Sequence, residues 1–246
     1  MGALGGKRAI VTGASSGIGA ATAASLRAEG ATVAVGARRT EQLDGDFVHE
    51  LDVTEPASCG RFVEAAAGAL GRIDILVNNA GLALGRDPFW ASTEEDEETI
   101  LETNVHGVIR MTRLCLPHMD GGGHIVNLGS VAGLWAYPNG ALYCVSKAAV
   151  EMFTRALRED LLGRPVRVTT VSPGLVETEF SKVRFRGDEE KAAAVYDDLA
   201  VGGPLRAEDV ADCILFAVTR LMHVNVDEIV VMALSQSSGA RILRST

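Results

Sequence analysis

The chain has 246 residues, 47% of them hydrophobic and 22% charged, which is the balance of a soluble globular protein with a large core. Its formal net charge of −9, from 23 basic against 32 acidic side chains, disfavours binding to nucleic acids. No apolar run approaches the roughly 18 residues that span a membrane, and no signal-peptide core precedes the first strand, so we expect a cytoplasmic protein without membrane contact.

Short apolar runs alternate along the chain with segments of helical periodicity. The runs are rich in Val, Ile and Leu on both faces, as buried parallel strands are. Strands are predicted over residues 8–12, 32–37, 47–51, 73–78, 124–128, 167–172 and 228–233. Helices are predicted over residues 17–29, 57–70, 93–118, 142–163, 188–200 and 207–220. This order predicts an α/β fold, a doubly wound parallel seven-stranded sheet flanked by helices on both faces, in a single domain over residues 1–246.

The turn after the first strand is rich in glycine and opens a helix. It reads TGASSGIG over residues 12–19. A tight turn followed by a helix N-terminus brings backbone amides up to a pyrophosphate, so we predict a dinucleotide site here; a merely tight turn is the alternative. The predicted cofactor-binding residues of the turn are Gly13, Ser15, Ser16, Gly17, Ile18 and Gly19.

The end of the second strand indicates which dinucleotide binds. An NAD site places a carboxylate there for the ribose 2′-hydroxyl, whereas an NADP site places an arginine for the 2′-phosphate. Here Ala37 stands at the carboxylate position, and Arg38 and Arg39 follow it. Because a guanidinium donates two parallel hydrogen bonds to a phosphate, we predict NADP; the alternative is a solvated basic turn.

Asp52 and Val53 follow the third strand and are also predicted to bind the cofactor. The Asp52 carboxylate would accept a hydrogen bond from the adenine amine. The competing interpretation makes Asp52 the N-cap of the next helix, with Glu55 three residues later.

Residues 94–98 read EEDEE, a run of acids that a cation could attract. The preferred interpretation is a helix start, because acidic side chains stabilise the positive end of the helix dipole. Ser92 and Glu95 also have the spacing of a capping box.

Tyr143 and Lys147 lie four residues apart on a predicted helix, so their side chains share one face. A free phenol, with a pKa of about 10, is a poor acid–base group at neutral pH. A nearby ammonium favours the phenolate, so we expect Lys147 to lower the pKa of Tyr143 and let it exchange a proton with an alcohol or ketone. Ser130, at the end of the fifth strand, would hold the same substrate oxygen.

Together these residues resemble a known family, the short-chain dehydrogenases/reductases of the classical type. The resemblance covers essentially the whole chain. The matching segments are TGASSGIG at 12–19, NNAG at 78–81, Asn104, Ser130, Tyr143 with Lys147, and Pro173 with Gly174. The resemblance implies a Rossmann-like domain. In it, Asn104, Ser130, Tyr143 and Lys147 would form a catalytic tetrad that moves a hydride between a nicotinamide and a carbonyl or alcohol.

The resemblance also assigns further positions. It implies that Asn104 kinks its helix and holds a water beside the lysine, and that Thr178 binds the nicotinamide carboxamide. The other cofactor-binding residues that it implies are Asn79, Ala80, Gly81, Tyr143, Lys147, Pro173, Gly174 and Val176. Ser16 departs from the family, because NADP-binding members often carry Lys or Arg inside the glycine turn. The prediction of NADP therefore depends on Arg38 and Arg39.

Residues 81–85, 173–188 and 223–237 resemble a narrower group, the NADP-dependent 3-hydroxy acid dehydrogenases that include serine and allo-threonine dehydrogenases. This resemblance implies oxidation of the hydroxyl beta to a carboxylate, or reduction of the matching oxo acid. A carboxylate substrate needs a fixed cation near the catalytic tyrosine. We hypothesise that Arg184 or Arg186 supplies it; a surface pair is the alternative.

Two features depart from that group: Ala233 stands where it tends to carry proline, and residues 86–92 match no clear segment of it. Two other functions stay open. One is a broad carbonyl or 3-oxoacyl reductase of the same family, although the C-terminus lacks the GQ and DGG signature of acyl-carrier ketoreductases. The other is a non-catalytic NADP-binding sensor, which the filled tetrad positions disfavour.

The expected partners are a small hydroxy or oxo acid and further copies of the chain. The resemblance implies a tetramer or dimer formed through the helix of Tyr143 and the one before it, and apolar residues on several sides of residues 142–163 permit such an interface. Four cysteines lie far apart and five histidines show no ligand spacing, so we expect reduced thiols and no metal.

Overall fold

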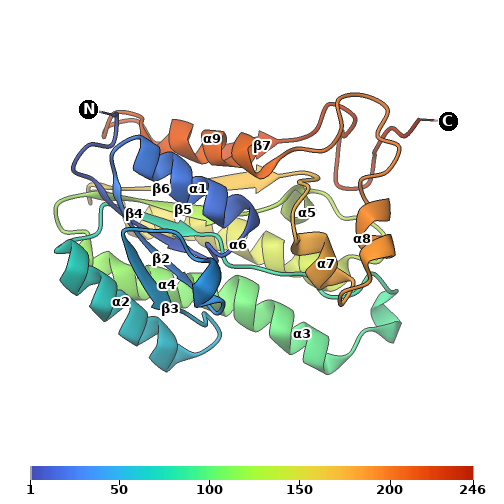
Figure 1. The fold of residues 1–246 in the computed structure, drawn as a ribbon, viewed down its shortest axis with the longest axis horizontal. Coiled ribbons are helices and arrows are strands. Elements are labelled where there is room, and N and C mark those ends of the chain that lie inside the picture. Colours follow the sequence, from blue (N-terminus) through green and yellow to red (C-terminus); the bar gives the residue numbers. More distant parts are fainter. Residues whose placement is uncertain (1, 246) are drawn as a thin grey trace.

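The computed structural model describes residues 2–245, which fold around one sheet of seven parallel strands. The strand order is β3-β2-β1-β4-β5-β6-β7, so the chain runs outward from β1 to one edge, returns to β4 beside β1, and then runs to the other edge. Figure 1 shows helices on both faces of this sheet. The predicted doubly wound, seven-stranded α/β fold is confirmed.

All the predicted strands are present, with ends that differ from the prediction by at most two residues. The strands are β1 (Arg8–Thr12), β2 (Thr32–Ala37), β3 (Phe47–Glu50), β4 (Ile75–Asn78), β5 (Gly123–Leu128), β6 (Val166–Pro173) and β7 (Glu228–Val231). The helices are α1 (Gly17–Ala28), α2 (Pro56–Leu70), α3 (Glu94–Leu101), α4 (Gly107–Cys115), α5 (Val131–Leu134), α6 (Ala141–Asp160), α7 (Phe180–Arg184), α8 (Glu189–Ala194) and α9 (Ala207–Val218). Over residues 2–245, none of the helices has the length and hydrophobicity needed to cross a bilayer.

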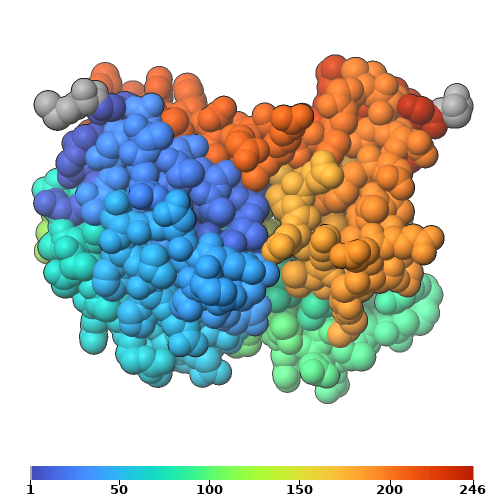
Figure 2. Space-filling model, viewed as in Figure 1, coloured from blue at the N-terminus to red at the C-terminus, as the bar shows by residue number. Residues whose placement is uncertain are grey.

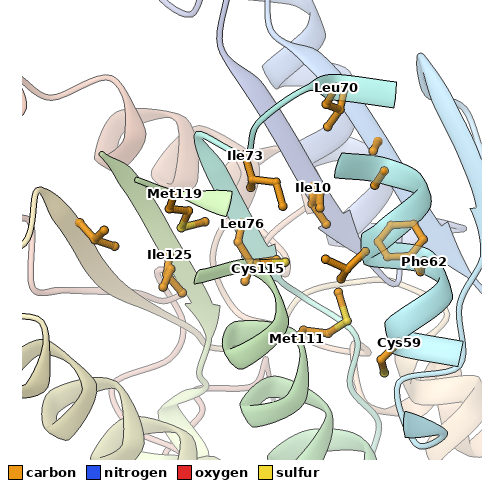
Figure 3. Close-up of a cluster of buried hydrophobic side chains, with 14 of the residues drawn as sticks. Ile10, Cys59, Phe62, Leu70, Ile73, Leu76, Met111, Cys115, Met119 and Ile125 are labelled. Atoms are coloured by element: carbon orange, nitrogen blue, oxygen red, sulfur yellow. The ribbon is translucent and has the colours of Figure 1, made fainter. Parts of the chain in front are cut away.

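Helices α2, α4 and α6 cover one face of the sheet over a core of aliphatic, aromatic and sulfur-containing side chains. In Figure 3, Phe62 of α2 and Met111 and Cys115 of α4 gather beside Ile10 of β1 and Leu76 of β4. These five side chains are fully excluded from solvent, and burying one such side chain stabilises a fold by about 1.5–3 kcal/mol. This core fixes the two central strands from which the candidate site is built.

Helices α1 and α9 lie side by side on the opposite face (Figure 1). Their buried Leu26 and Ile214 pack with Val11 of β1 and Val33 of β2 in a second apolar cluster. Since α1 follows the glycine turn directly, this packing fixes the N-terminus of α1 at the carboxyl end of β1.

The predicted helix over residues 93–118 is interrupted by a π-helical turn at Glu102–His106. Asn104 lies in this turn, and its side chain accepts a 2.8 Å hydrogen bond from the Leu82 amide and donates one of 2.8 Å to the Leu82 carbonyl. A π-turn inserts an extra residue into the helical register, which turns Asn104 onto the loop after β4. Periodicity alone predicts a continuous helix, whereas the family resemblance implies a kink at this residue.

The acidic start of α3 lies one residue later than predicted. Thr93 is the N-cap, and its side chain accepts a hydrogen bond of 3.2 Å from the Asp96 amide. The Ser92 hydroxyl donates instead to the Phe89 carbonyl at 2.6 Å, because Ser92 ends a preceding 3₁₀ turn. The predicted capping box of Ser92 and Glu95 is therefore wrong.

Periodicity also misses short helices and overextends one. Helices α5 and α7 have only 4 and 5 residues, too few to show a repeat along the sequence. The predicted helix over residues 188–200 covers only α8, Glu189–Ala194. Beyond it, Asp198 has a positive φ of 55°, a conformation that does not continue a right-handed helix.

The direction of the chain reverses between β1 and β4, which are neighbours in the sheet. Loops that leave such a pair of strands diverge and open a crevice at the carboxyl ends, where ligands of this architecture bind. The glycine turn follows β1, and residues 78–81 lie at the end of β4 and just after it. The topology therefore brings these two motifs to the same crevice.

His124 of β5 makes the fold sensitive to acid. Its side chain is fully buried beside the Thr169 hydroxyl, 2.7 Å away, and burial, aided by the charge of Arg167, lowers its pKa to about 3. Between pH 6.5 and 3 the unfolded chain takes up a proton that the folded chain excludes, so the free energy of unfolding falls as the pH falls. We expect urea titrations at pH 7 and 5 to show this loss, and His124→Gln to reduce it; an equal loss in the variant would contradict the assignment.

Candidate active site

A cavity of about 620 Å³ lies at the carboxyl ends of the strands, within the usual size range of small-molecule sites. Its walls are the glycine turn, the ends of β4 and β5, and the segment after β6. On the face drawn in Figure 2, that last segment, coloured gold to orange, meets the blue N-terminal segment along one seam. Every predicted site residue lines this cavity except Gly19, Asn104 and Arg186.

The glycine turn packs directly on the loop after β4. The Asn79 side-chain amide donates to the carbonyls of Thr12 and Gly13 at 2.9 and 3.0 Å. The Thr12 hydroxyl accepts hydrogen bonds of 3.0 Å from the amides of Asn79 and Ala80. A Cβ at Gly19, which is predicted to bind the cofactor, would lie only 2.4 Å from the Asn79 side chain, so glycine at this position permits the close approach.

The N-terminus of α1 leaves backbone amides open to the cavity. Ser16 is the N-cap residue, and its side chain makes no capping hydrogen bond to the helix. Gly17 follows with a positive φ of 53°, and a Cβ there would lie 3.1 Å from Thr178 across the cavity. Unpaired amides at the positive end of a helix dipole attract an anion, so this turn fits the pyrophosphate of a dinucleotide.

Arg38 and Arg39 line the same end of the cavity. The Arg39 guanidinium also donates hydrogen bonds to three side chains of the protein. Its Nη2 donates to the hydroxyls of Ser15 and Ser16, both at 3.3 Å, and to Glu179 at 3.0 Å. Hydrogen bonds from Arg39 and Ser16 lower the pKa of Glu179. Both partners of the Arg39–Glu179 ion pair are about half exposed, so the guanidinium is accessible to a ligand that carries a phosphate.

Asp52 lines the cavity but does not cap α2. Its Oδ1 accepts hydrogen bonds from the Thr54 amide at 3.0 Å and the Thr54 hydroxyl at 2.7 Å. The N-cap residue of α2 is Glu55, followed by Pro56. The alternative interpretation of Asp52 as N-cap is therefore wrong, because the helix begins four residues later.

Ser130, Tyr143 and Lys147 converge where β5 ends and α6 begins. The Ser130 hydroxyl caps α5 by accepting a hydrogen bond of 3.1 Å from the Ala132 amide. The Lys147 ammonium lies 5.9 Å from the centre of the Tyr143 ring and donates to the Leu128 carbonyl at 2.7 Å. The last strand residue thus holds the lysine beside the phenol, as the four-residue spacing on α6 predicts.

Asn104 bonds to two segments beside this group, the loop after β4 and helix α6. Besides its two bonds to Leu82, its Nδ2 donates to the Ser146 hydroxyl at 3.0 Å, next to Lys147 in the chain. A Cβ at Gly81 would lie 3.2 Å from Asn104 Oδ1 and 3.6 Å from Lys147 Nζ. Asn104 therefore joins the loop after β4 to helix α6 and fixes the surroundings of the lysine.

The electrostatics of the phenol differ from the prediction. Burial raises the pKa of Tyr143, and nearby Tyr137 raises it further, while a hydrogen bond with Ser130 and the charge of Arg184 lower it. Burial also lowers the pKa of Lys147 to about 8. The pKa of Tyr143 is therefore raised and not lowered as predicted, because burial outweighs the hydrogen bond with Ser130 and the charge of Arg184.

The two arginines proposed for a substrate carboxylate occupy different places. The Arg184 guanidinium lies 5.8 Å from the centre of the Tyr143 ring, and its Nη2 donates to the Tyr137 hydroxyl at 3.0 Å. Arg186 donates to both carboxylate oxygens of Asp96 at 2.7 Å and lies outside the cavity. Of the two arginines, only Arg184 lies beside Tyr137 and Tyr143.

The cavity also holds polar residues that the sequence did not indicate, and three of them bear on the site: Arg86, Tyr137 and Glu179. Tyr137 and Arg86 lie in irregular segments without periodicity, so only their nearness to the motifs could have indicated them. The structure shows that Gly140 makes room for the Tyr137 ring, since a Cβ there would lie 2.2 Å from it. Glu179 directly follows Thr178 but contacts Arg39 only through the fold.

Comparison with known proteins gives consistent findings. The family model described as short chain dehydrogenase matches residues 7–189. The chain is 40% identical to the NADP-dependent 3-hydroxy acid dehydrogenase YdfG of Salmonella typhi, over 96% of this chain and 99% of that protein. It is also 40% identical to sulfoacetaldehyde reductase 2 of Chromohalobacter salexigens, over 94% and 96% of the two chains. The closed form of a serine dehydrogenase complexed with NADP+ superposes with a TM-score of 0.89 at 38% identity, covering 97% and 100%.

Proposed function

This chain belongs to the short-chain dehydrogenase family, and we propose that it transfers a hydride between NADP(H) and a small 3-hydroxy acid or its oxo acid. The convergence of Ser130, Tyr143, Lys147 and Arg184 on one cavity with the glycine turn carries this proposal. The similarity to a 3-hydroxy acid dehydrogenase and to a serine dehydrogenase complexed with NADP+ supports it.

The residues proposed to hold the cofactor divide by chemical group. The glycine turn and the open amides of α1 would bind the pyrophosphate, and Arg38 and Arg39 the 2′-phosphate. Asp52 and Val53 would contact the adenine. The remaining contacts, to the nicotinamide and its ribose, would come from Asn79, Ala80, Gly81, Tyr143, Lys147, Pro173, Gly174, Val176 and Thr178.

When bound, the nicotinamide supplies or accepts the hydride at the substrate carbon. During reduction, the Tyr143 hydroxyl would give its proton to the substrate oxygen, and the phenolate would take a proton back during oxidation. Ser130 would donate a second hydrogen bond to the same oxygen. Since burial raises the pKa of the phenol, Tyr143 is protonated at neutral pH, which suits proton donation. Lys147, held by the Leu128 carbonyl, would stabilise the phenolate that remains.

The substrate carboxylate is assigned to Arg184. Its guanidinium lies beside the Tyr143 ring, and its contacts are the neutral Gly85 carbonyl and Tyr137 hydroxyl. No carboxylate of residues 2–245 forms an ion pair with it, so the charge is available to a substrate anion. A fixed guanidinium binds a carboxylate through parallel hydrogen bonds.

An assay of NADPH absorbance tests the proposed function. We expect oxidation of serine or 3-hydroxybutyrate with NADP+, and kcat/KM values well above those for the neutral 2-butanol. Turnover of neutral alcohols alone would favour a broad carbonyl reductase. NADPH binding without turnover of any hydroxyl or carbonyl compound would favour a sensor.

A sulfonated aldehyde is the second candidate substrate. The similarity to sulfoacetaldehyde reductase 2 favours it, because a guanidinium binds the oxygens of a sulfonate as well as those of a carboxylate. Sulfoacetaldehyde with NADPH belongs in the same assay, and a kcat/KM above that for oxo acids would make this reaction the main one.

We further propose a homo-oligomer, a dimer or tetramer, in the cytoplasm. Val145 and Met152 lie seven residues apart on one face of α6 and are 57% and 62% exposed, so a second copy of the chain could cover them. The four cysteines are free thiols within residues 2–245, as suits a reducing compartment. A single dinucleotide-binding domain over residues 1–246 completes the proposal.

Glu179 competes with the cofactor for Arg39. Because its carboxylate already accepts a hydrogen bond from Arg39, the 2′-phosphate must displace it and also approach its negative charge. We expect Glu179→Gln to lower the Kd of 2′,5′-ADP by about two- to fivefold, since an exposed ion pair contributes roughly 0.2–1 kcal/mol. Calorimetric titration measures this, with 5′-AMP as control; a weaker or unchanged affinity for 2′,5′-ADP would contradict it.

A further inference from the structure

Two guanidinium groups flank one aromatic ring at the tyrosine end of the cavity. The Arg184 guanidinium carbon lies 5.5 Å from the centre of the Tyr137 ring, and that of Arg86 lies 5.8 Å from the same centre. Both arginines line the cavity that Ser130 and Tyr143 also line. A ring face attracts a cation at these distances, so Tyr137 serves as a common platform for both.

The arginines come from segments that are bonded to each other. The Gly85 amide donates to the Arg184 carbonyl at 2.9 Å, and the Arg184 Nε donates back to the Gly85 carbonyl at 3.1 Å. Gly85 has a positive φ of 64°, which suits glycine and directs the chain into Arg86. These reciprocal bonds fix the backbone of Arg86 beside that of Arg184.

Neither charge is balanced by the protein. Within residues 2–245 Arg86 has no hydrogen-bond or ion-pair partner, and Arg184 contacts only neutral oxygens. Other arginines nearby differ: Arg39 has Glu179, and Arg186 has Asp96. Burial raises the pKa of Tyr137 and Cys144 raises it further, whereas Arg184 and Arg86 lower it. Both guanidiniums therefore act on this end of the cavity, and neither has an ion-pair partner within residues 2–245.

We propose that Arg86 is a second anion-binding residue, and that the favoured substrates are hydroxy or oxo acids with a second anionic group. The inference rests on the proposed function and refines its substrate class. One carboxylate would bind Arg184 beside Tyr143, and the second would reach Arg86, which is exposed at the mouth of the cavity. When a doubly charged substrate displaces water from the site, its two anionic groups pair with both arginines. A singly charged substrate pairs with one arginine and leaves the other without a counter-charge.

The test compares 3-hydroxyglutarate, a dianion, with 3-hydroxybutyrate, a monoanion, as substrates for NADP+ reduction. We expect the wild-type protein to prefer the dianion in kcat/KM by about tenfold, the value of one charge-assisted hydrogen bond at the lower end of its range. Arg86→Met keeps much of the unbranched apolar stem but removes the charge, and it should lower kcat/KM for the dianion far more than for the monoanion, so that the preference is lost. Arg113→Met removes an exposed arginine outside the cavity and should leave the preference intact.

A measurement of ligand binding tests the role of Arg86 independently of turnover. Glutarate should bind more tightly than butyrate in calorimetric titrations of the wild-type protein, and the difference should vanish in Arg86→Met. An equal fall for both acids in Arg86→Met would mean that both arginines bind one carboxylate, and an unchanged ratio would mean that Arg86 binds neither; each result overturns the inference. Failure of the proposed function appears differently, as no NADP+-dependent oxidation of any hydroxy acid by the wild-type protein.

Discussion

Tyr143→Phe is expected to lower kcat for hydroxy acid oxidation by about 10²–10⁴-fold, the usual contribution of a positioned acid–base group. The phenylalanine keeps the ring and its contact with Phe180, whose centre lies 5.6 Å away, so the cavity should keep its shape. The variant loses only the hydroxyl that exchanges a proton with the substrate oxygen. Steady-state kinetics give kcat, and fluorescence titration with NADPH shows whether the cofactor still binds.

The result separates a chemical role from a structural one. Ser130→Ala is the graded comparison, because it removes a hydrogen bond to the same substrate oxygen but no proton transfer, and a smaller loss of kcat is expected. A Tyr143→Phe protein that keeps more than about a tenth of wild-type kcat would exclude the phenol as the acid–base group. Loss of NADPH binding together with a lower melting temperature would instead make Tyr143 a structural residue.

Replacing Arg38 and Arg39 together by alanine is expected to raise the Kd of 2′,5′-ADP by about 100-fold or more, since each of two charge-assisted hydrogen bonds contributes roughly 1.5–3 kcal/mol. The Kd of 5′-AMP should change little, because that ligand lacks the 2′-phosphate. Calorimetric titration of both ligands measures the two values. Arg113→Ala, a change in an exposed arginine of α4, controls for the loss of net positive charge.

An equal weakening for both ligands would show that the arginines act on the shape of the turn rather than on the phosphate. Arg39 has a further role here, since it joins Ser15, Ser16 and Glu179. A double-mutant cycle of Arg39→Ala and Glu179→Gln isolates the coupling between them. We expect the benefit of Glu179→Gln to disappear once Arg39 is removed.

The part of the site that can be predicted from the sequence consists of residues that lie close together in the chain. The glycine turn and the tyrosine–lysine pair are each defined by residues a few positions apart on one element, so their spacing is visible in the chain. Parallel strands then bring the loops at their carboxyl ends to one edge of the sheet. The sheet itself is predictable for a similar reason, because its strands are continuous apolar runs.

The part of the site that cannot be predicted from the sequence depends on contacts between segments far apart in the chain. Glu179 pairs with Arg39 across 140 residues of sequence, and Arg186 has Asp96 rather than a substrate as its partner because the fold brings α3 beside the segment after α7. The π-turn at Asn104 depends on the backbone of Leu82, which no helical period encodes. The raised pKa of Tyr143 depends on burial, a property of the assembled cavity.

The reciprocal bonds between Gly85 and Arg184 make two walls of the cavity one mechanical unit. We expect the two segments to move together, because parting them breaks both bonds. Where the movement of such segments limits product release, substitutions in either of them would change the turnover rate without touching the reacting carbon.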